Sequence, residues 1–165
     1  LKEICFKLSE FMTALCFGKY PSAYESEVKR VIRDGSALNR LCTAVKSQGG
    51  NADLITGKKQ FKKAKTAVPI YSENSGFVIS MNCETVGKAA QLSGAGRETK
   101  DDVIDNSAGI VLNKKYGDRV EKGELLATVY GAEERTAEAA EMLKTAYSFG
   151  NEKPEKRPVI YKAIY

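Results

Sequence analysis

The first fifty residues contain apolar side chains at the spacing of amphipathic helices. In residues 1–17 they recur every three to four positions and form one stripe, made of Leu1, Ile4, Cys5, Leu8, Phe11, Met12, Leu15 and Cys16. Gly18 and Pro21 predict the end of this helix. Because a stripe of this kind usually packs into a core, we interpret it as structural.

Two further helices are predicted before residue 50. Ser22 and Glu25 have the spacing of a capping box, which predicts a second helix that ends at Asp34-Gly35. Ser36 is expected to cap a third helix, which Gly49-Gly50 stops. The amino-terminal segment is therefore predicted to be three helices over residues 1–50.

Residues 51–66 are polar and predict a solvated linker. They carry Lys58, Lys59, Lys62, Lys63 and Lys65. A nucleic-acid surface would interleave arginines and aromatic side chains with the lysines, and only Phe61 is present. We therefore expect a domain boundary here and no nucleic-acid partner, with residues 67–165 forming a second domain.

Strand and helix patterns alternate in this second domain. Residues 67–71 and 76–81 are strand-like and are joined by the turn 72–75, and Asn82 is expected to cap a short helix over 83–92. Short apolar runs separated by turn signals then predict paired strands, with Glu121-Lys122-Gly123-Glu124 as a charged hairpin tip.

The last thirty residues predict one more helix and a final strand. The helical face contains Thr136, Ala139, Ala140, Leu143, Ala146 and Tyr147, and residues 159–164 read as a strand. Helices that enclose strands in this mixed order indicate an α+β fold rather than a doubly wound parallel sheet.

Composition narrows the possible chemistry. The 165 residues are 42% hydrophobic and 28% charged, which is ordinary for one domain or two small ones. The net charge of +5 favours anionic ligands. The four cysteines have no CxxC spacing and predict reduced thiols in a cytoplasmic protein. The sequence has no apolar run long enough to span a membrane, so no membrane partner is expected. Histidine is absent, which excludes imidazole catalysis and histidine metal sites within this chain.

The segment Ser93-Gly94-Ala95-Gly96-Arg97 is the most unusual loop in the chain. Glycines expose backbone N–H groups, and an arginine fork suits a phosphate, so the segment can be interpreted as an anion site. It lacks the G-x-x-x-x-G-K-[ST] pattern, however, and does not lead from a strand into a helix. A plain turn is the other interpretation, in which the glycines adopt positive φ. The nearby Asp101, Asp102 and Asp105 are expected to stabilise turns rather than to bind a metal.

A family resemblance rests on this loop and on the residues after it. The run from Gly94 to Gly131 resembles the carboxy-terminal domain of pyrimidine-nucleoside and thymidine phosphorylases. The pieces that carry the resemblance, in order and spacing, are Gly94-Ala95-Gly96-Arg97, Asp102-Val103-Ile104-Asp105, Ala108-Gly109-Ile110-Val111-Leu112 and Gly117-Asp118-Arg119-Val120-Glu121-Lys122-Gly123-Glu124. Leu1-Lys2-Glu3-Ile4-Cys5 looks like an internal helix of the family, and Pro158-Val159-Ile160-Tyr161 looks like its ending.

The resemblance implies the carboxy-terminal portion of a pentosyltransferase. The family catalyses reversible phosphorolysis of pyrimidine nucleosides in cytoplasmic salvage, as a homodimer, with phosphate as cosubstrate. The resemblance implies that residues 1–50 belong to the family's α/β domain, where they pack on an upstream sheet, and that 67–165 form a hammerhead-like α+β domain.

The resemblance also bears on the site residues. The family's phosphate- and base-binding motifs have no counterpart here, so no catalytic, substrate-binding or metal-binding residue carries over. No cofactor is expected, and the chain alone is expected to be inactive. The loop with Gly94, Gly96 and Arg97 corresponds to one that helps to close the family's active-site cleft.

An alternative comes from another class of protein. The segment Gly117–Glu124 also resembles the G-D-x-V-x-K-G hairpin of biotinyl and lipoyl carrier domains, which present a modified lysine on an exposed turn. The turn at the expected distance upstream is Ser72-Glu73-Asn74-Ser75, which has no lysine. A carrier or a non-catalytic binding domain therefore remains the second hypothesis.

Overall fold

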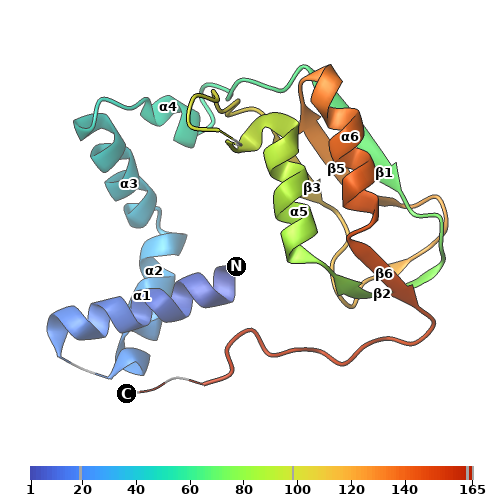
Figure 1. Cartoon of the computed structure of the whole chain (residues 1–165). Helices are drawn as coiled ribbons and strands as arrows, with labels where there is room; N and C mark the ends of the chain where they lie inside the picture. The colour runs from blue at the N-terminus through green and yellow to red at the C-terminus, as the bar shows by residue number, and fades with distance from the viewer. Residues whose placement is uncertain (19, 98, 163, 165) are drawn as a thin grey trace. The chain divides into compact units, whose positions relative to one another are not determined.

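The chain consists of two compact units. The computed structural model describes residues 1–18, 20–97, 99–162 and 164. One unit comprises Leu1–Gln60 with Arg157–Tyr165, and the other comprises Phe61–Lys156 (Figure 1). The first is helical and the second mixes helices with antiparallel strands, so the predicted α+β class is confirmed. The sequence-based division into 1–50, 51–66 and 67–165 stays a prediction.

The helical unit follows the predicted order of helices. It contains α1 (Lys2–Phe17), a 3₁₀ turn η1 (Pro21–Tyr24), α2 (Glu25–Arg33), α3 (Ser36–Ser47) and the short α4 (Ala52–Ile55). Helix α1 ends at Gly18, whose φ of 73° is left-handed and whose N–H donates to the carbonyl of Ala14. Helix α4 lies in the predicted linker, and the Asn51 side chain caps it by accepting from the Asp53 N–H.

Two of the predicted helix caps are wrong. Pro21 starts a 3₁₀ turn, so the segment from Ser22 to Glu25 makes no side-chain cap. Gly35, with φ of 78°, is the N-cap of α3, and Ser36 is already the first helical residue. The Ser36 N–H donates instead to a carboxylate oxygen of Asp34 at 2.9 Å. Asp34 is the C-cap of α2, so the N-cap position of α3 falls on Gly35, which has no side chain to accept a hydrogen bond.

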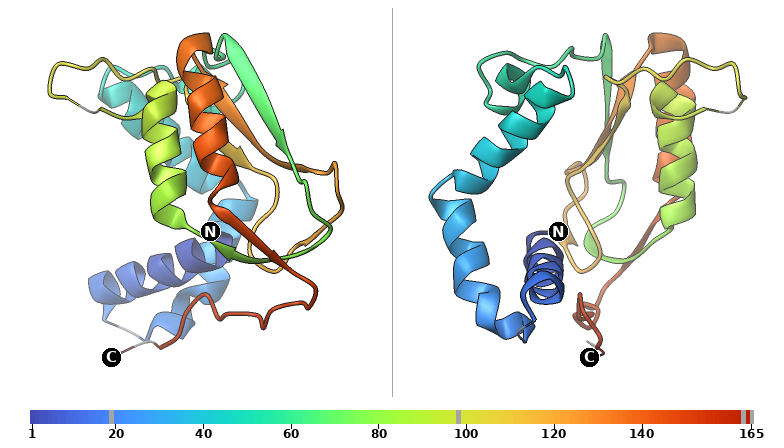
Figure 2. Two further views of the ribbon diagram at one scale, coloured as in Figure 1. Left: turned by 45° about the vertical axis from the view of Figure 1, so that its right-hand side comes forward. Right: turned by 90° about the vertical axis from the view of Figure 1, so that its left-hand side faces the viewer.

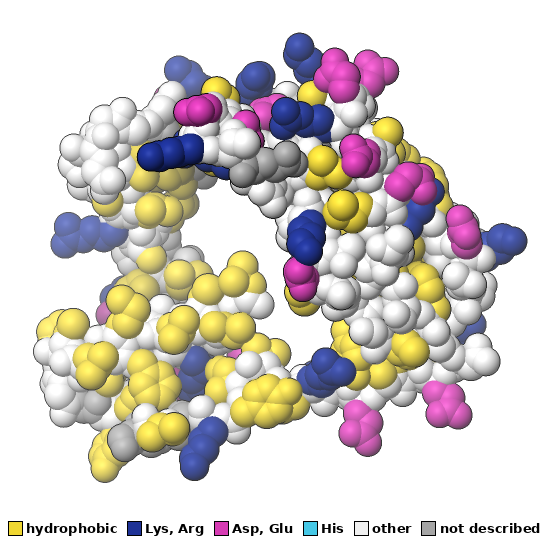
Figure 3. Space-filling view, viewed as in Figure 1, with side chains coloured by type: hydrophobic (Ala, Val, Ile, Leu, Met, Phe, Trp, Pro, Cys, Tyr) yellow, Lys and Arg dark blue, Asp and Glu magenta, His cyan; other side chains and the backbone are white. Residues whose placement is uncertain are grey.

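The apolar stripe of α1 is not a core within this unit. Leu8, Met12 and Leu15 are 57%, 66% and 86% exposed, and Figure 3 shows many hydrophobic side chains at the surface of the helical unit. The buried side of α1 instead contains Glu10, which is 2% exposed and accepts from the Lys7 ammonium at 2.7 Å. The apolar face of α1 therefore has no covering surface within the described part of this unit, as expected for a helix that packs on an upstream sheet.

The mixed unit contains two antiparallel three-stranded sheets. The first has the order β1 (Thr66–Tyr71), β5 (Leu125–Gly131), β3 (Gly109–Leu112), and the second has the order β4 (Arg119–Val120), β2 (Gly76–Met81), β6 (Tyr147–Gly150). Helices α5 (Cys83–Ala90) and α6 (Glu133–Lys144) lie side by side on one face of the first sheet (Figures 1 and 2).

Two of the connections between the sheets are turns that are hydrogen-bonded to each other. Residues 72–75 lead from β1 to β2, and residues 121–124 lead from β4 to β5. The Ser72 N–H donates to Glu124 O at 2.9 Å, and the Gly123 N–H donates to Ser72 O at 2.7 Å. The predicted hairpin tip at 121–124 is therefore wrong, because β4 pairs with β2 and β5 pairs with β1 and β3.

The core lies between the helices and the sheets. Its buried members are Ile70, Val78, Ala89, Val120, Leu126, Ala127, Val129, Ala139, Ala140, Leu143, Ala146 and Tyr147. Alanines on both helices let α5 and α6 approach each other closely.

Tyr147, predicted on the helical face, instead starts β6, and its hydroxyl donates towards Lys114 O (3.2 Å) and Leu126 O (3.4 Å). Burial raises the pKa of Tyr147 to about 12.

The predicted strand over 159–164 is also wrong, since its described residues have no regular structure.

Gly131, the last residue of β5, lies directly against the end of the α5 segment. A Cβ at this position would come 2.3 Å from Ser93 O and 3.2 Å from Thr136 Cγ2. No side chain fits there without moving backbone, so this glycine allows the segment after α5 to contact the sheet.

The glycines of this region yield a paired stability prediction. We expect Gly131→Ala to lower the free energy of unfolding by about 1–3 kcal/mol, because the methyl group overlaps a backbone carbonyl. The matched control is Gly87→Ala on the exposed side of α5, where a Cβ meets nothing within 4 Å. It should raise the free energy of unfolding by about 0.5–1 kcal/mol. Denaturant unfolding followed by circular dichroism measures both, and equal effects would contradict the close contact.

Candidate functional site

The glycine-rich loop starts from a widened turn at the end of α5. Asn82 caps this helix by accepting from the Thr85 N–H at 3.0 Å, which confirms the predicted cap. After Ala90 the chain makes one π-type turn, Gln91–Ala95, inside which Gly94 has a φ of 107°. Glycine adopts this conformation at little cost, so Gly94 needs positive φ as expected. Ser93 beside it is buried, and its hydroxyl donates to Ala90 O at 2.7 Å.

A backbone hydrogen bond closes the base of this loop. The Asp105 N–H donates to Gly94 O at 3.0 Å and so defines residues 95–104, here termed the Arg97 loop. The Asp105 carboxylate accepts from the N–H of Ser107 at 2.9 Å and from its hydroxyl at 2.6 Å. Ala108 N–H adds a bond to Asp105 O at 2.9 Å. The base of the loop is thus ordered by backbone and side-chain bonds together.

The described part of the Arg97 loop projects beyond the end of α5 (Figure 2). It is held by few contacts. The Thr99 N–H and hydroxyl donate to the Asp102 carboxylate at 2.9 and 2.8 Å, forming a local turn. The Gln91 side-chain amide donates to the carbonyl of Arg97. Arg97 itself is exposed.

Gly96 differs from the expectation of positive φ. Its backbone is extended, with φ of −138° and ψ of 177°, a conformation that any residue adopts. Its lack of a side chain matters for another reason. A Cβ at Gly96 would lie 3.0–3.2 Å from the Cγ, Cα and Cβ atoms of Gln91. Close approach, rather than backbone conformation, therefore favours glycine here.

Two of the three aspartates near the loop serve turns, as predicted. Asp102 and Asp105 accept bonds from Thr99 and Ser107 respectively, and Asp101 is exposed. The hydrogen bonds from Ser107 lower the pKa of Asp105, and the charges of Lys62 and Lys65 lower it further. Among the described residues, no group of three or more His, Cys, Asp or Glu side chains is placed to hold a metal ion.

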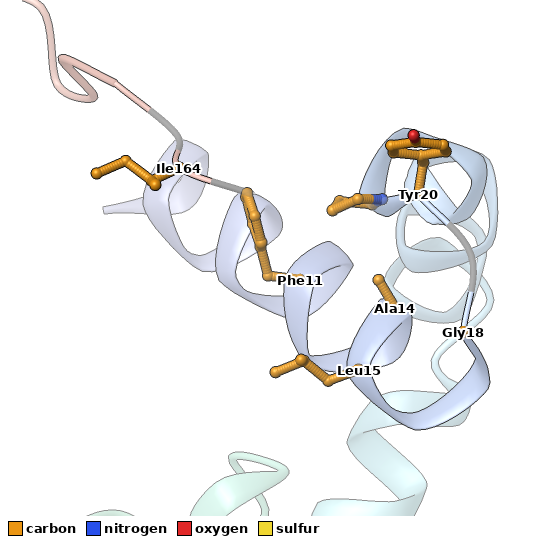
Figure 4. Close-up of a pocket in the computed structure, with 7 residues that line it drawn as sticks. Phe11, Ala14, Leu15, Gly18, Tyr20 and Ile164 are labelled. Atoms are coloured by element: carbon orange, nitrogen blue, oxygen red, sulfur yellow. The ribbon is translucent and has the colours of Figure 1, made fainter.

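Two pockets have the size of a small-molecule binding site. One, of 440 Å³, adjoins the base of the Arg97 loop and is lined by Phe61, Lys62 and residues 103–107. The other, of 620 Å³, lies in the helical unit and is shown in Figure 4. It is lined by Phe11, Ala14, Leu15, Gly18, Tyr20, Pro21 and Ile164. Among the described residues that line this larger pocket none is charged, and Arg97 lines neither of the two, so neither pocket uses the predicted loop cation.

The geometry limits what the predicted loop can do. The glycine segment follows a helix and leads into irregular backbone, so the strand–loop–helix arrangement of a phosphate-binding P-loop is not formed. Gly94, Gly96 and Arg97 do lie together at the root of one projecting loop. Sequence reasoning missed Gln91 and Ser107; only the Asp105-Asn106-Ser107 pattern, typical of an Asx turn, offered a signal.

Comparison with known proteins identifies the domain that carries this loop. Residues 77–150 match the family described as the pyrimidine nucleoside phosphorylase C-terminal domain. The chain contains this domain. The matched residues include β2, α5, the Arg97 loop, β3–β5, α6 and β6, which is most of the mixed unit.

Curated relatives carry the corresponding enzyme name. The pyrimidine-nucleoside phosphorylase of Geobacillus stearothermophilus is 35% identical over 144 residues, which are 86% of this chain and 33% of the relative. That of Bacillus subtilis is 36% identical over 113 residues (68% and 26%), and that of Staphylococcus epidermidis is 39% identical over 99 residues (60% and 23%). The family resemblance is thereby confirmed, and the chain spans a third or less of the length of these relatives.

The carrier hypothesis finds no support at its expected turn. Residues 72–75 contain no lysine, and Ser72 is buried. The Lys122 N–H donates to the hydroxyl of Ser75 at 2.9 Å, which ties this turn to the one at 121–124.

No helix within the described ranges has the length and apolar character that a bilayer crossing requires.

The lowered pKa of Asp105 leads to a prediction about pH. Since folding lowers this pKa, the carboxylate stabilises the loop base above the ordinary aspartate range, and the contribution is lost as pH falls through the lowered value. We expect the Ser107 amide proton to shift with a midpoint below the ordinary aspartate pKa in an NMR titration. Asp105→Asn, which keeps an acceptor oxygen but cannot ionise, should abolish this step. A midpoint at the ordinary value would contradict the bond.

Proposed function

We propose that this chain is the carboxy-terminal portion of a pyrimidine-nucleoside phosphorylase, a pentosyltransferase. In the reaction, a phosphate oxygen forms a bond to the anomeric carbon while the glycosidic C–N bond breaks. The base leaves with the electron pair and takes up a proton, and pentose 1-phosphate remains. The match of residues 77–150 to the family, together with the names of the relatives, carries this proposal.

The role of the chain within such an enzyme is to close the site rather than to react. The chain has no histidine, and Asp102 and Asp105 are engaged in turns. The Arg97 loop combines an ordered base with an exposed cation, which suits a segment that closes over anionic phosphate and excludes water. We therefore propose that Gly94, Gly96 and Arg97 belong to the cleft-closing loop, and that the chain alone is inactive.

We further propose a homodimeric, cytoplasmic enzyme of pyrimidine salvage that uses phosphate and no bound cofactor. The exposed apolar face of α1 supports a requirement for a further protein surface, because Leu8, Met12 and Leu15 are otherwise hydrated. The cysteine pattern of the sequence supports the compartment.

A chimaera provides the direct test. The 144-residue region of the Geobacillus stearothermophilus enzyme that matches this chain would be replaced by the chain itself. We expect the chimaera to release uracil or thymine from uridine or thymidine in a phosphate-dependent reaction, measured by chromatography. The chain alone and the truncated relative alone are the controls, and both should be inactive.

The outcomes of this test are distinct. Phosphate-dependent release by the chimaera, proportional to enzyme concentration, supports the proposal. A folded chimaera that releases no base would overturn the proposed function. Phosphorolysis by the purified chain alone would overturn the site-closing role proposed for the chain. Thermal melting of the chimaera separates loss of folding from loss of activity.

The loop residues yield a prediction in the active chimaera. Arg97→Ala should lower kcat about tenfold or more, since it removes a cation that acts on closure, while the melting temperature changes little because the side chain is exposed. Gly96→Val should lower kcat further, because its side chain meets Gln91 at about the distance of a clash. Steady-state kinetics and melting on both variants decide. Unchanged kcat with a sharply lower melting temperature would show a purely structural turn.

A further inference from the structure

We infer that Gln91 is a positioning residue for Arg97, holding the backbone of Gly96 and Arg97 in one orientation at the end of the α5 segment. The inference rests on the proposed function, in which Arg97 acts when the loop closes. Its first observation is the hydrogen bond from Gln91 Nε2 to Arg97 O, at 2.5 Å. A carbonyl oxygen only accepts, so the amide nitrogen is the group that must face it.

A second, independent contact involves the neighbouring residue. Gly96 lies against the aliphatic part of Gln91, where a Cβ on Gly96 would come within 3.0–3.2 Å of three Gln91 carbon atoms. The same side chain therefore packs against Gly96 and donates a hydrogen bond to the carbonyl of Arg97. Both contacts concern the backbone at the point where the Arg97 side chain branches off, and this sets the direction in which that side chain leaves.

The position of Gln91 makes it an effective support. It is the first residue of the π-type turn, which contains Gly94 with positive φ and is fixed by the Ser93–Gly131 contact. The Gln91 backbone is therefore part of the rigid base, whereas Arg97, six residues later, lies in the projecting loop. A bond between a fixed and a projecting part reduces the number of orientations that Arg97 can adopt before closure.

The expected kinetic signature follows from this preorganisation. If Gln91 orients Arg97 for the closed state, its loss lowers the fraction of bound complexes that reach the reactive geometry. The effect then falls on kcat more than on KM, and it disappears when Arg97 is absent. A residue that merely stabilised the fold would lower the melting temperature and would act independently of Arg97.

The activity arm uses the chimaera defined above. Gln91→Leu, which is similar in size but has no donor, should lower kcat about tenfold with KM changed less than about twofold, as expected for a misplaced group. In the Arg97→Ala background the same substitution should cause no further loss. Gln91→Glu places a carboxylate against a carbonyl at neutral pH. Its deficit relative to the parent should shrink as pH falls, because a protonated carboxyl group donates.

The structural arm uses the 165-residue chain and needs no activity. Amide hydrogen exchange in residues 99–105 should be several-fold faster in Gln91→Leu, with β5 and α6 unchanged. Gln60→Leu, at an exposed glutamine, is the control and should change neither.

The two arms separate the possible failures. If the chimaera with Gln91 is inactive, the proposed function fails, and the exchange experiment still decides whether Gln91 holds the loop. If the chimaera is active but Gln91→Leu equals the parent in kcat, or adds its full loss to Arg97→Ala, the positioning role is overturned. Unchanged exchange in residues 99–105 overturns it as well.

Discussion

The close approach of the Ser93 carbonyl to Gly131 is the constraint on which the loop region depends. There is no space for a side chain at Gly131, since a Cβ would lie 2.3 Å from that oxygen. This contact joins the turn after α5 to the last residue of β5, the central strand of the first sheet. The base of the Arg97 loop therefore shares the rigidity of a core in which Ala127, Val129 and Leu143 are fully buried.

The contacts that stabilise the base of the loop differ in kind from those that stabilise the rest of it. Below the Gly94–Asp105 bond, apolar burial and backbone pairing dominate. Above it, the described residues rely on local polar bonds such as Thr99 to Asp102, and apolar side chains like Val103 remain hydrated at 90% exposure. Segments with few buried contacts open at low free-energy cost. A rigid base below a loosely held loop is the arrangement that a cleft-closing segment requires.

The sequence predicted those features that depend on neighbours along the chain. The helical period of α1, the Asn82 cap and the turn-forming aspartates are all local patterns, and each is present. The errors arose where distant partners decide. Alternation in β4 and β5 looks the same whether the strands pair or lie in different sheets, so the pattern predicts a hairpin at 121–124 that the structure does not form. Tyr147 fits a helical period, but its hydroxyl finds carbonyl partners in strand geometry. Glycine composition indicates the loop, but the reason for each glycine depends on its neighbours in space: Gly94 adopts positive φ, whereas Gly96 leaves room for Gln91.

The two units differ in how far they satisfy their own apolar surface, and this difference bears on the proposed enzyme. The mixed unit has a contiguous buried core of its own. In the helical unit, α1 buries Glu10 and exposes Leu8, Met12 and Leu15. At ~25 cal/mol per Å² of apolar surface, covering a few hundred Å² of such a face is worth several kcal/mol. The helical unit is therefore expected to gain the most stability when a further protein surface covers it. The mixed unit already has a complete core that supports the Arg97 loop. In the proposed phosphorylase, loop position would then depend on the platform alone, and the helical face would serve assembly.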